Sequence, residues 1–200
     1  KVASIGTLGV KSKSINLNLS NTTIDPILLA QILNKLKSQK IENVIMEASS
    51  HGLKQNRLDG LNFDIGIFTN LSHDHLDYHK NISDYLNSKI YLFRELIKKK
   101  GIIITDATIP QYKILRDISD KKNFRLLTVY SSNSDLELVS HKYYNDQQIL
   151  KVGIKNKKKI IKFKLNLIGK IQIKNVLMAI MAVIRGGLDI NSIEKTIVKL

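Results

Sequence analysis

The chain has 200 residues, of which 43% are hydrophobic, with no cysteine and a formal net charge of +15. This length suits one large domain or two small ones, the absence of cysteine excludes disulfides and thiolate metal sites, and every apolar run is shorter than a membrane span. Only 5 of the 32 basic residues are Arg, the side chain that most often reads nucleic-acid bases. The charge therefore does not predict a nucleic-acid partner, and a cytoplasmic protein is expected.

Strands and helices alternate over the first 130 residues. Apolar runs predict strands at residues 2–7, 43–47, 64–71, 102–106 and 126–130. Helical spacing of apolar residues predicts helices at 26–36, 82–97 and 110–119. Asp25 and Asn81 are the expected N-caps of the first two helices, and Gly101 is expected to end the second. The strand at 43–47 is expected to be buried, and residues 49–52 are expected to form a turn. This order predicts an α/β fold with a mostly parallel, doubly wound sheet.

The pattern changes near residue 135. From 135 to 168, alternating segments predict a small antiparallel β section. Helices are then expected at 173–185 and 190–200, separated by a Gly-Gly pair. Residues 1–200 show no repeat or linker and are expected to form one domain, and the lack of an initiator Met indicates a fragment.

A dense group of His and Asp residues follows the strand predicted at 64–71. Its sequence is His73-Asp74-His75-Leu76-Asp77-Tyr78-His79. A strand that ends in such residues places them at the carboxyl edge of an α/β sheet, where ligands bind. Because imidazole and carboxylate bind divalent metal ions, a metal site is the first hypothesis. A polar loop whose histidines hydrogen-bond the backbone is the structural alternative.

Lys89 lies on the apolar stripe of the helix predicted at 82–97, between Tyr85 and Phe93. Its stem could cover apolar surface while its ammonium group reaches water. A buried Lys close to the His/Asp group would instead be driven toward its neutral form and could take part in chemistry.

Taken together, these segments resemble the central domain of the Mur ligase family. The specific blocks are Met46-Glu47-Ala48-Ser49-Ser50-His51-Gly52-Leu53 with Gln55 and Arg57, Phe68 to His79, and Lys89. Supporting matches are Ile5 to Gly9, Asn21-Thr22-Thr23 and Gly169 to Ala179. The likeness covers nearly the whole chain. Two departures are Ile24 where Pro is usual and Ile171-Gln172 where Phe-Asn is usual.

Within this family, the chain is most similar to the ligases that add the third residue of the peptidoglycan stem peptide. The resemblance implies ATP-dependent addition of meso-diaminopimelate or L-lysine to UDP-MurNAc-L-Ala-D-Glu through an acyl phosphate, by a cytoplasmic monomer. Family members cradle the phosphates with a Gly-Thr-x-Gly-Lys-Thr/Ser loop, which these 200 residues lack. We therefore expect the central domain without its phosphate loop and without the N- and C-terminal domains, and nearly inert alone.

The resemblance also implies roles for individual residues. Glu47, His75 and Lys89 are expected to be catalytic and to hold two Mg²⁺ ions, one at Glu47 and one at His75 with Lys89. A cationic Lys cannot bind a metal, so the resemblance implies that CO₂ converts Lys89 to an anionic carbamate. The UDP-muramoyl dipeptide is expected to be bound by Asn21, Thr22, Thr23, Ser49, Gln55 and Arg57. The nucleotide is expected to lie near Asn70 and Asn175.

His51 and His79 are expected to support the loops by hydrogen bonds rather than to bind metal. Three other interpretations remain. A metallo-hydrolase has the signature His-x-His-x-Asp-His, but Tyr78 stands at its sixth position. A ligase like folylpolyglutamate synthetase uses the same chemistry on another acceptor, against which the Glu-Ala-Ser-Ser-His and Asn-Thr-Thr blocks argue. A basic, non-catalytic binding module leaves Lys89 and the His/Asp group unexplained. No nucleic-acid or membrane partner is expected.

Overall fold

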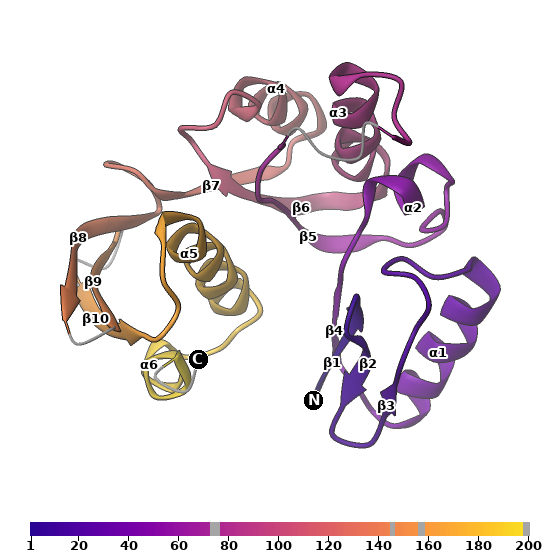
Figure 1. The fold of residues 1–200 in the computed structure, drawn as a ribbon, viewed down its shortest axis with the longest axis horizontal. Coiled ribbons are helices and arrows are strands. Elements are labelled where there is room, and N and C mark those ends of the chain that lie inside the picture. The colour runs from indigo at the N-terminus through magenta and orange to yellow at the C-terminus, as the bar shows by residue number, and fades with distance from the viewer. Residues whose placement is uncertain (73–76, 145–146, 156–158, 198–200) are drawn as a thin grey trace. The chain divides into compact units, whose positions relative to one another are not determined.

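The structure is a computed structural model that describes residues 1–72, 77–144, 147–155 and 159–197. The chain forms two compact units (Figure 1). Unit 1 contains residues 1–62 and 72–96, and unit 2 contains residues 63–71 and 97–200.

Unit 1 holds a four-stranded sheet with the order β3-β2-β1-β4. Its strands are β1 (Val2–Gly6), β2 (Gly9–Ser12), β3 (Asn16–Leu17) and β4 (Asn43–Met46). β1 runs parallel to β4 and antiparallel to β2. The sequence did not predict β2 and β3. Gly9, with φ of 88°, forms the turn between β1 and β2, and a Cβ there would lie 2.0 Å from the Leu17 carbonyl oxygen.

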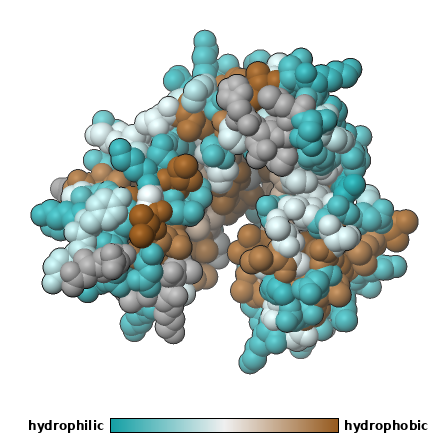
Figure 2. All heavy atoms as spheres, viewed as in Figure 1, coloured by the Kyte–Doolittle hydropathy of each residue, from teal (hydrophilic) through white to brown (hydrophobic). Residues whose placement is uncertain are grey.

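The strand β4 was expected to be buried, and this prediction was wrong within unit 1. Val44 and Ile45 are 38% and 59% exposed, because β4 is an edge strand of the four-stranded sheet. Figure 2 shows hydrophobic side chains gathered on the visible face of unit 1 around β1 to β4.

The helices predicted in unit 1 begin where the sequence places their caps. They are α1 (Pro26–Ser38), α2 (Ser50–Lys54), α3 (Ile82–Tyr91) and the π-helical turn η1 (Leu92–Leu96). The Asp25 side chain accepts from the backbone N–H groups of Ile27 and Leu28, and the Asn81 side chain accepts from that of Asp84. The turn predicted at 49–52 is instead the start of α2, because the Ser49 hydroxyl caps a short helix by accepting from the Gly52 N–H.

The predicted end of the 82–97 helix at Gly101 was also wrong. Helical structure ends at Leu96, and β6 begins at Ile97 and passes through Gly101. Pairing with β5 determines this boundary, since Phe63 lies opposite Ile97. The register then shifts, and Ile65 lies opposite Ile102. A Cβ on Gly101 would lie 2.4 Å from Ile97 Cγ2, so the glycine marks a close approach inside the strand.

Unit 2 is built on a six-stranded sheet with the order β10-β9-β8-β7-β6-β5. Its strands are β5 (Phe63–Phe68), β6 (Ile97–Asp106), β7 (Arg125–Tyr130), β8 (Leu136–Tyr144), β9 (Gln147–Ile154) and β10 (Lys159–Leu165). β5 to β8 are parallel, and β8 to β10 are antiparallel. The predicted parallel sheet and the predicted antiparallel section at 135–168 are both confirmed.

Both faces of the parallel strands are covered, as in a doubly wound fold. Consecutive side chains of a strand point to opposite faces, and Ile103 and Ile104 of β6 are both 0% exposed. The helices α4 (Tyr112–Lys122) and α5 (Lys170–Arg185) each contact β6 and β7, and Figure 1 draws them on opposite sides of these strands.

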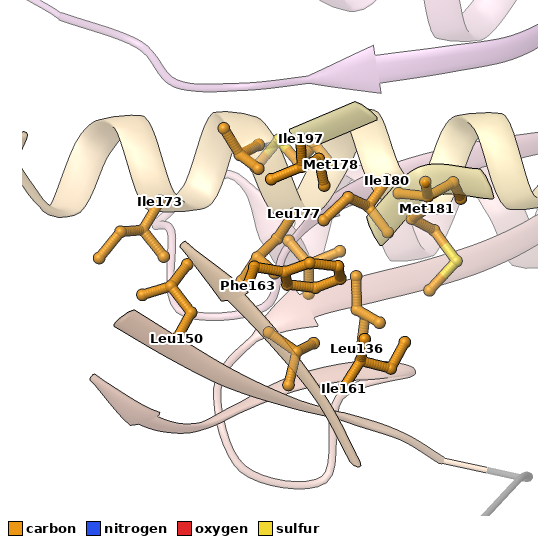
Figure 3. Packing of buried hydrophobic residues seen from close by; sticks show 14 of the residues in the cluster. Leu136, Leu150, Ile161, Phe163, Ile173, Leu177, Met178, Ile180, Met181 and Ile197 are labelled. Carbon is orange, nitrogen blue, oxygen red and sulfur yellow. The ribbon is translucent and has the colours of Figure 1, made fainter. Parts of the chain in front are cut away.

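The main core of unit 2 lies between α5 and the antiparallel strands (Figure 3). Leu136, Leu150 and Phe163 face Leu177 of α5, and the helix α6 (Ile190–Ile197) adds Ile197. Each fully buried side chain of this size contributes about 1.5–3 kcal/mol relative to an exposed one. Among the described residues, no helix has the length and apolar character to cross a membrane.

Candidate functional site

Glu47 and Thr7 follow the ends of the two parallel strands β4 and β1, so they meet at the same edge of the unit 1 sheet. Glu47 Oε2 accepts hydrogen bonds from the Thr7 backbone N–H at 2.9 Å and from the Thr7 hydroxyl at 2.8 Å. The backbone of Gly6 allows this approach, since a Cβ there would lie 2.7 Å from the same oxygen. The carboxylate is therefore exposed but held in one orientation.

Thr23 joins the predicted substrate loop to the segment that follows Glu47. It is 3% exposed, and its hydroxyl donates to the Glu47 carbonyl at 3.1 Å. The same oxygen lies 2.9 Å from the Ser49 N–H and 3.0 Å from Ser49 Oγ. A Cβ on Gly52 would lie 2.4 Å from the Thr23 methyl group, so the start of α2 packs directly against Thr23. The Thr23 side chain thus bonds to and packs against other groups of the protein.

Three other residues predicted to bind substrate lie around Thr23. Thr22 Oγ1 is 3.0 Å from Thr7 Oγ1, and Arg57 donates from Nη1 to the Thr23 carbonyl at 2.7 Å. Asn21 is exposed, and its amide lies 3.5 Å from Ser20 Oγ. Unit 1 therefore brings Glu47, Thr22, Thr23, Ser49 and Arg57 into one hydrogen-bonded group.

Gln55, the C-cap residue of α2, is linked to a different segment. Its side-chain amide donates to the Tyr78 hydroxyl at 2.9 Å. His79, the next residue, is buried and lies 2.9 Å from Ser50 Oγ through Nε2. The expectation that His79 supports this region by a hydrogen bond is confirmed.

Lys89 lies one helical turn after Tyr85 in α3, where it is half-buried. Its Nζ is 5.1 Å from the centre of the Tyr85 ring, as in a cation–π contact. His75, the third predicted metal ligand, lies outside the described residues, as does His73. Among the described residues, no group of three or more His, Cys, Asp or Glu side chains is arranged to hold a metal ion. The binuclear Mg²⁺ site stays a prediction.

The two predicted nucleotide residues both belong to unit 2. Asn70 follows β5, and Asn175 lies in the second turn of α5. Both are exposed, and Thr69 Oγ1 lies 3.4 Å from Asn70 Oδ1.

An ion pair beside Asn175, between a half-buried Lys and a buried Asp, was not predicted. Asp106, the last residue of β6, is 0% exposed and accepts from the N–H and hydroxyl of Thr108, each at 2.8 Å. Lys174 Nζ lies 2.5 Å from Asp106 Oδ2 and 4.6 Å from the centre of the Tyr130 ring. Tyr130 has φ of 83°, which is uncommon for a bulky side chain and marks a strained strand end. These contacts attach the start of α5 to the carboxyl ends of β6 and β7.

Residues 1–183 match the family described as the Mur ligase middle domain. The chain belongs to the Mur ligase family. Members of this family are ATP-dependent ligases that form amide bonds and use Mg²⁺.

Several Mur ligases are similar to the chain over nearly its full length. The UDP-N-acetylmuramoyl-L-alanyl-D-glutamate–2,6-diaminopimelate ligase of Zymomonas mobilis is 36% identical over 190 residues, which cover 95% of this chain and 39% of that protein. The ligase of the same name from Rickettsia bellii is 34% identical and covers 100% of this chain and 42% of that protein. The chain thus spans about two fifths of the length of these Mur ligases.

Solved Mur ligase structures share the fold. A structure titled UDP-N-acetylmuramoyl-L-alanyl-D-glutamate–2,6-diaminopimelate ligase superposes with a TM-score of 0.87 at 24% identity, covering 100% of this chain and 40% of that one. The MurF ligase from Thermotoga maritima in complex with ADP superposes with a TM-score of 0.60 at 16% identity, covering 76% of this chain and 35% of that one. At these identities the likeness concerns the fold alone.

The donor groups of unit 1 fit the Mg²⁺ of Mur ligases in part. The oriented carboxylate of Glu47 is the kind of oxygen ligand that Mg²⁺ prefers. Lys89 as an ammonium group carries the wrong charge, so it would serve only after conversion to an anion.

Sequence reasoning missed residues that hold the predicted site residues in place within each unit. In unit 1 these are Thr7, Ser50 and Tyr78. In unit 2 they are Asp106, Lys174 and Tyr130. For Thr7, Asp106 and Tyr130 a signal was available, because each lies at the carboxyl end of a predicted parallel strand, where functional groups gather.

Proposed function

We propose that the chain is the central domain of an ATP-dependent ligase of peptidoglycan precursor synthesis, which adds diaminopimelate to UDP-MurNAc-L-Ala-D-Glu. The observation that carries the proposal is the hydrogen-bonded group at the carboxyl ends of β1 and β4, which gathers Glu47 with four of the six residues predicted to bind this substrate. The diaminopimelate ligases similar to the chain favour diaminopimelate over L-lysine, the other candidate.

The reaction joins a carboxylate to an amine at the expense of ATP. A substrate carboxylate oxygen bonds to the γ-phosphorus while the bond from that phosphorus to the β–γ bridging oxygen breaks, which releases ADP. The amine then attacks the carbonyl carbon of the acyl phosphate, loses a proton and displaces inorganic phosphate. Both partners in the first step are anions, so positioning and neutralisation of charge determine its rate.

The chain's own residues bind the substrate and hold one another in position. Arg57, fixed by its bond to the Thr23 carbonyl, presents a guanidinium group to the anionic substrate. Ser49 and Gln55, at the two ends of α2, together with Asn21 and Thr22, bind the muramoyl dipeptide. Thr23 acts through its buried hydroxyl, which sets the positions of Glu47 and Ser49.

When Mg²⁺ is bound, it supplies the positive charge that neutralises the phosphoryl oxygens. Glu47 is the proposed ligand for one ion, and His75 with a carbamate formed on Lys89 for the other. Asn70 and Asn175 are proposed to contact the nucleotide. The ADP in the Thermotoga MurF structure supports a nucleotide site on this fold.

A phosphate-binding loop from outside these 200 residues is part of the proposal, because Gly-x-Gly-Lys-Thr/Ser is absent from the printed sequence. The proposed enzyme is a cytoplasmic monomer whose partners are its three substrates, without a nucleic acid or a membrane.

The proposal is tested with the full-length protein that contains this chain. ADP release is followed with ATP, Mg²⁺ and UDP-MurNAc-L-Ala-D-Glu, in the presence of meso-diaminopimelate or L-lysine, and the tripeptide product is identified by mass. We expect product with diaminopimelate and little with L-lysine. ADP release that does not depend on the dipeptide, or that depends on a folate and glutamate instead, would overturn the proposal.

A further inference from the structure

Tyr78 and His79 lie against α2 in unit 1, and both side chains bond to it. The Tyr78 hydroxyl accepts from Gln55, and His79 Nε2 lies 2.9 Å from Ser50 Oγ. Ser50 and His79 are 4% and 1% exposed, so little water competes for their bond. The same burial keeps both groups from touching a substrate. Their effect on any reaction must therefore pass through other residues.

The opposite side of the His79 ring faces α3. The ring stacks on that of Tyr85, with centroids 5.0 Å apart and planes inclined by 28°. Nδ1 lies 3.6 Å from Asp84 Oδ2, which is longer than a hydrogen bond but close enough for attraction between a polarised N–H and a carboxylate. In the tautomer with the proton on Nδ1, the ring presents an N–H toward Asp84 and the lone pair of Nε2 toward the Ser50 hydroxyl.

A series of contacts thus runs from α2 to Lys89. Ser50 bonds to His79, His79 stacks on Tyr85, and the centre of the Tyr85 ring lies 5.1 Å from Lys89 Nζ. A second link joins the helices nearby, where Lys54 of α2 lies 2.5 Å from Asp84 of α3.

We propose that His79 is a positioning residue for the ligase reaction, which fixes α2 relative to Lys89 on α3. The inference rests on the proposed function. α2 carries Ser49 at its N-cap and Gln55 at its C-cap, so a small rotation of this five-residue helix moves both substrate-binding side chains at once. Reaction rates fall steeply when substrate and catalytic group are displaced by a fraction of an ångström. A side chain that fixes the position of α2 therefore supports the reaction rate.

Conservative replacements separate this role from a general effect on folding. In His79→Gln the side-chain amide reaches the place of Nε2 and keeps the bond to Ser50, whereas His79→Asn places its amide near Nδ1. Ser50→Ala removes the other partner. In the full-length protein we expect His79→Asn and Ser50→Ala to raise the KM for UDP-MurNAc-L-Ala-D-Glu about three- to tenfold, as the loss of one hydrogen bond would.

Three further outcomes are expected. His79→Gln stays close to the unmodified protein. The KM for ATP is unchanged in all variants, since Asn70 and Asn175 belong to unit 2. The double variant His79→Asn/Ser50→Ala is no worse than either single one, because both remove the same bond. His141→Gln, in β8, is the matched control and leaves both KM values unchanged.

Hydrogen exchange gives a readout that does not need activity. The Leu53 and Gln55 amides, which bond to the Ser49 and His51 carbonyls, should exchange faster in His79→Asn and Ser50→Ala but not in His79→Gln. Unchanged exchange and unchanged KM would overturn the inference, as would equal rises in both KM values with no rescue by Gln. An unmodified protein with no dipeptide-dependent turnover would overturn the proposed function alone, and the exchange data would still decide whether His79 fixes α2.

Discussion

At the scale of single residues, the site depends on side chains that hold others in place. Glu47 is oriented by Thr7, and Ser49 by Thr23, through hydroxyl and backbone groups at the ends of strands. The sequence identified Glu47 and Ser49 because their types and spacing resemble a known family. It did not identify their supports, since a Thr after a strand is common and its partner is distant in the chain.

Replacing Glu47 by Gln tests the role of its negative charge. The amide oxygen can still accept from Thr7, so the fold should be kept while the proposed ligand for Mg²⁺ loses its charge. We expect kcat of the full-length protein to fall by about two to three orders of magnitude, with little change in the thermal midpoint. Glu42→Gln, at an exposed position, is the control. Activity close to normal in Glu47→Gln would contradict the assignment.

Replacing Lys89 tests the proposed carbamate. Lys89→Arg keeps the positive charge but cannot react with CO₂, so it should lose activity as fully as Lys89→Ala, by roughly two orders of magnitude or more in kcat. A short carboxylic acid added to the Ala variant should restore part of the activity. Steady-state kcat near normal in Lys89→Arg would show that Lys89 acts only as a positive charge.

At the scale of elements, strand periodicity predicted most of the sheet of unit 2, because its strands are buried and their apolar runs are long. The small strands β2 and β3 escaped prediction, since a two-residue strand such as Asn16–Leu17 has no period to detect. The end of the helix predicted at 82–97 was misplaced because pairing of Ile97 with β5 outweighs helical spacing. Tertiary contacts, which local patterns do not contain, decided both cases.

Thr23 provides a stability prediction for the junction between β4 and α2. Thr23→Val keeps the shape but leaves the Ser49 N–H and the Glu47 carbonyl without their partner in a buried place. The free energy of unfolding should fall by about 1–3 kcal/mol, measured by urea denaturation. Thr22→Val should cost less, because Thr22 is half-exposed and the partner of its hydroxyl, Thr7, is exposed. Equal effects of the two variants would argue against the central place of Thr23.

The buried His79 predicts a dependence of stability on pH. Burial, and next the charge of Lys54, lower the pKa of His79 below its usual value, while Asp84 opposes them. The folded state therefore binds fewer protons than the unfolded state, and stability present above about pH 6.5 is lost as the pH falls below that value. The titratable groups that face the ring are His51, Lys54, Tyr78, Asp84 and Tyr85.

Urea denaturation between pH 7.5 and 5, values chosen to bracket about 6.5, tests this dependence. The unmodified chain should lose stability across the range, and His79→Gln should lose less, because its amide does not titrate. The same change in the free energy of unfolding with pH in both proteins would show that groups other than His79 cause the loss of stability.

At the scale of the whole molecule, the chain spans about two fifths of the length of its similar ligases, and its phosphate cradle is proposed to lie elsewhere. The 200 residues alone should therefore show no measurable ATP hydrolysis and only weak affinity for ATP with Mg²⁺. Tight binding in calorimetry would contradict this expectation, because it would require phosphate ligands within the printed sequence.

The central claim is that these residues serve a ligase that activates a carboxylate with ATP. The most direct test supplies the full-length protein with UDP-MurNAc-L-Ala-D-Glu in which the reacting carboxylate carries ¹⁸O, together with ATP, Mg²⁺ and diaminopimelate. An acyl phosphate transfers one labelled oxygen to the phosphate that leaves, so mass spectrometry should find one ¹⁸O in phosphate for each tripeptide formed. Unlabelled phosphate, or ADP release without tripeptide, would contradict the account.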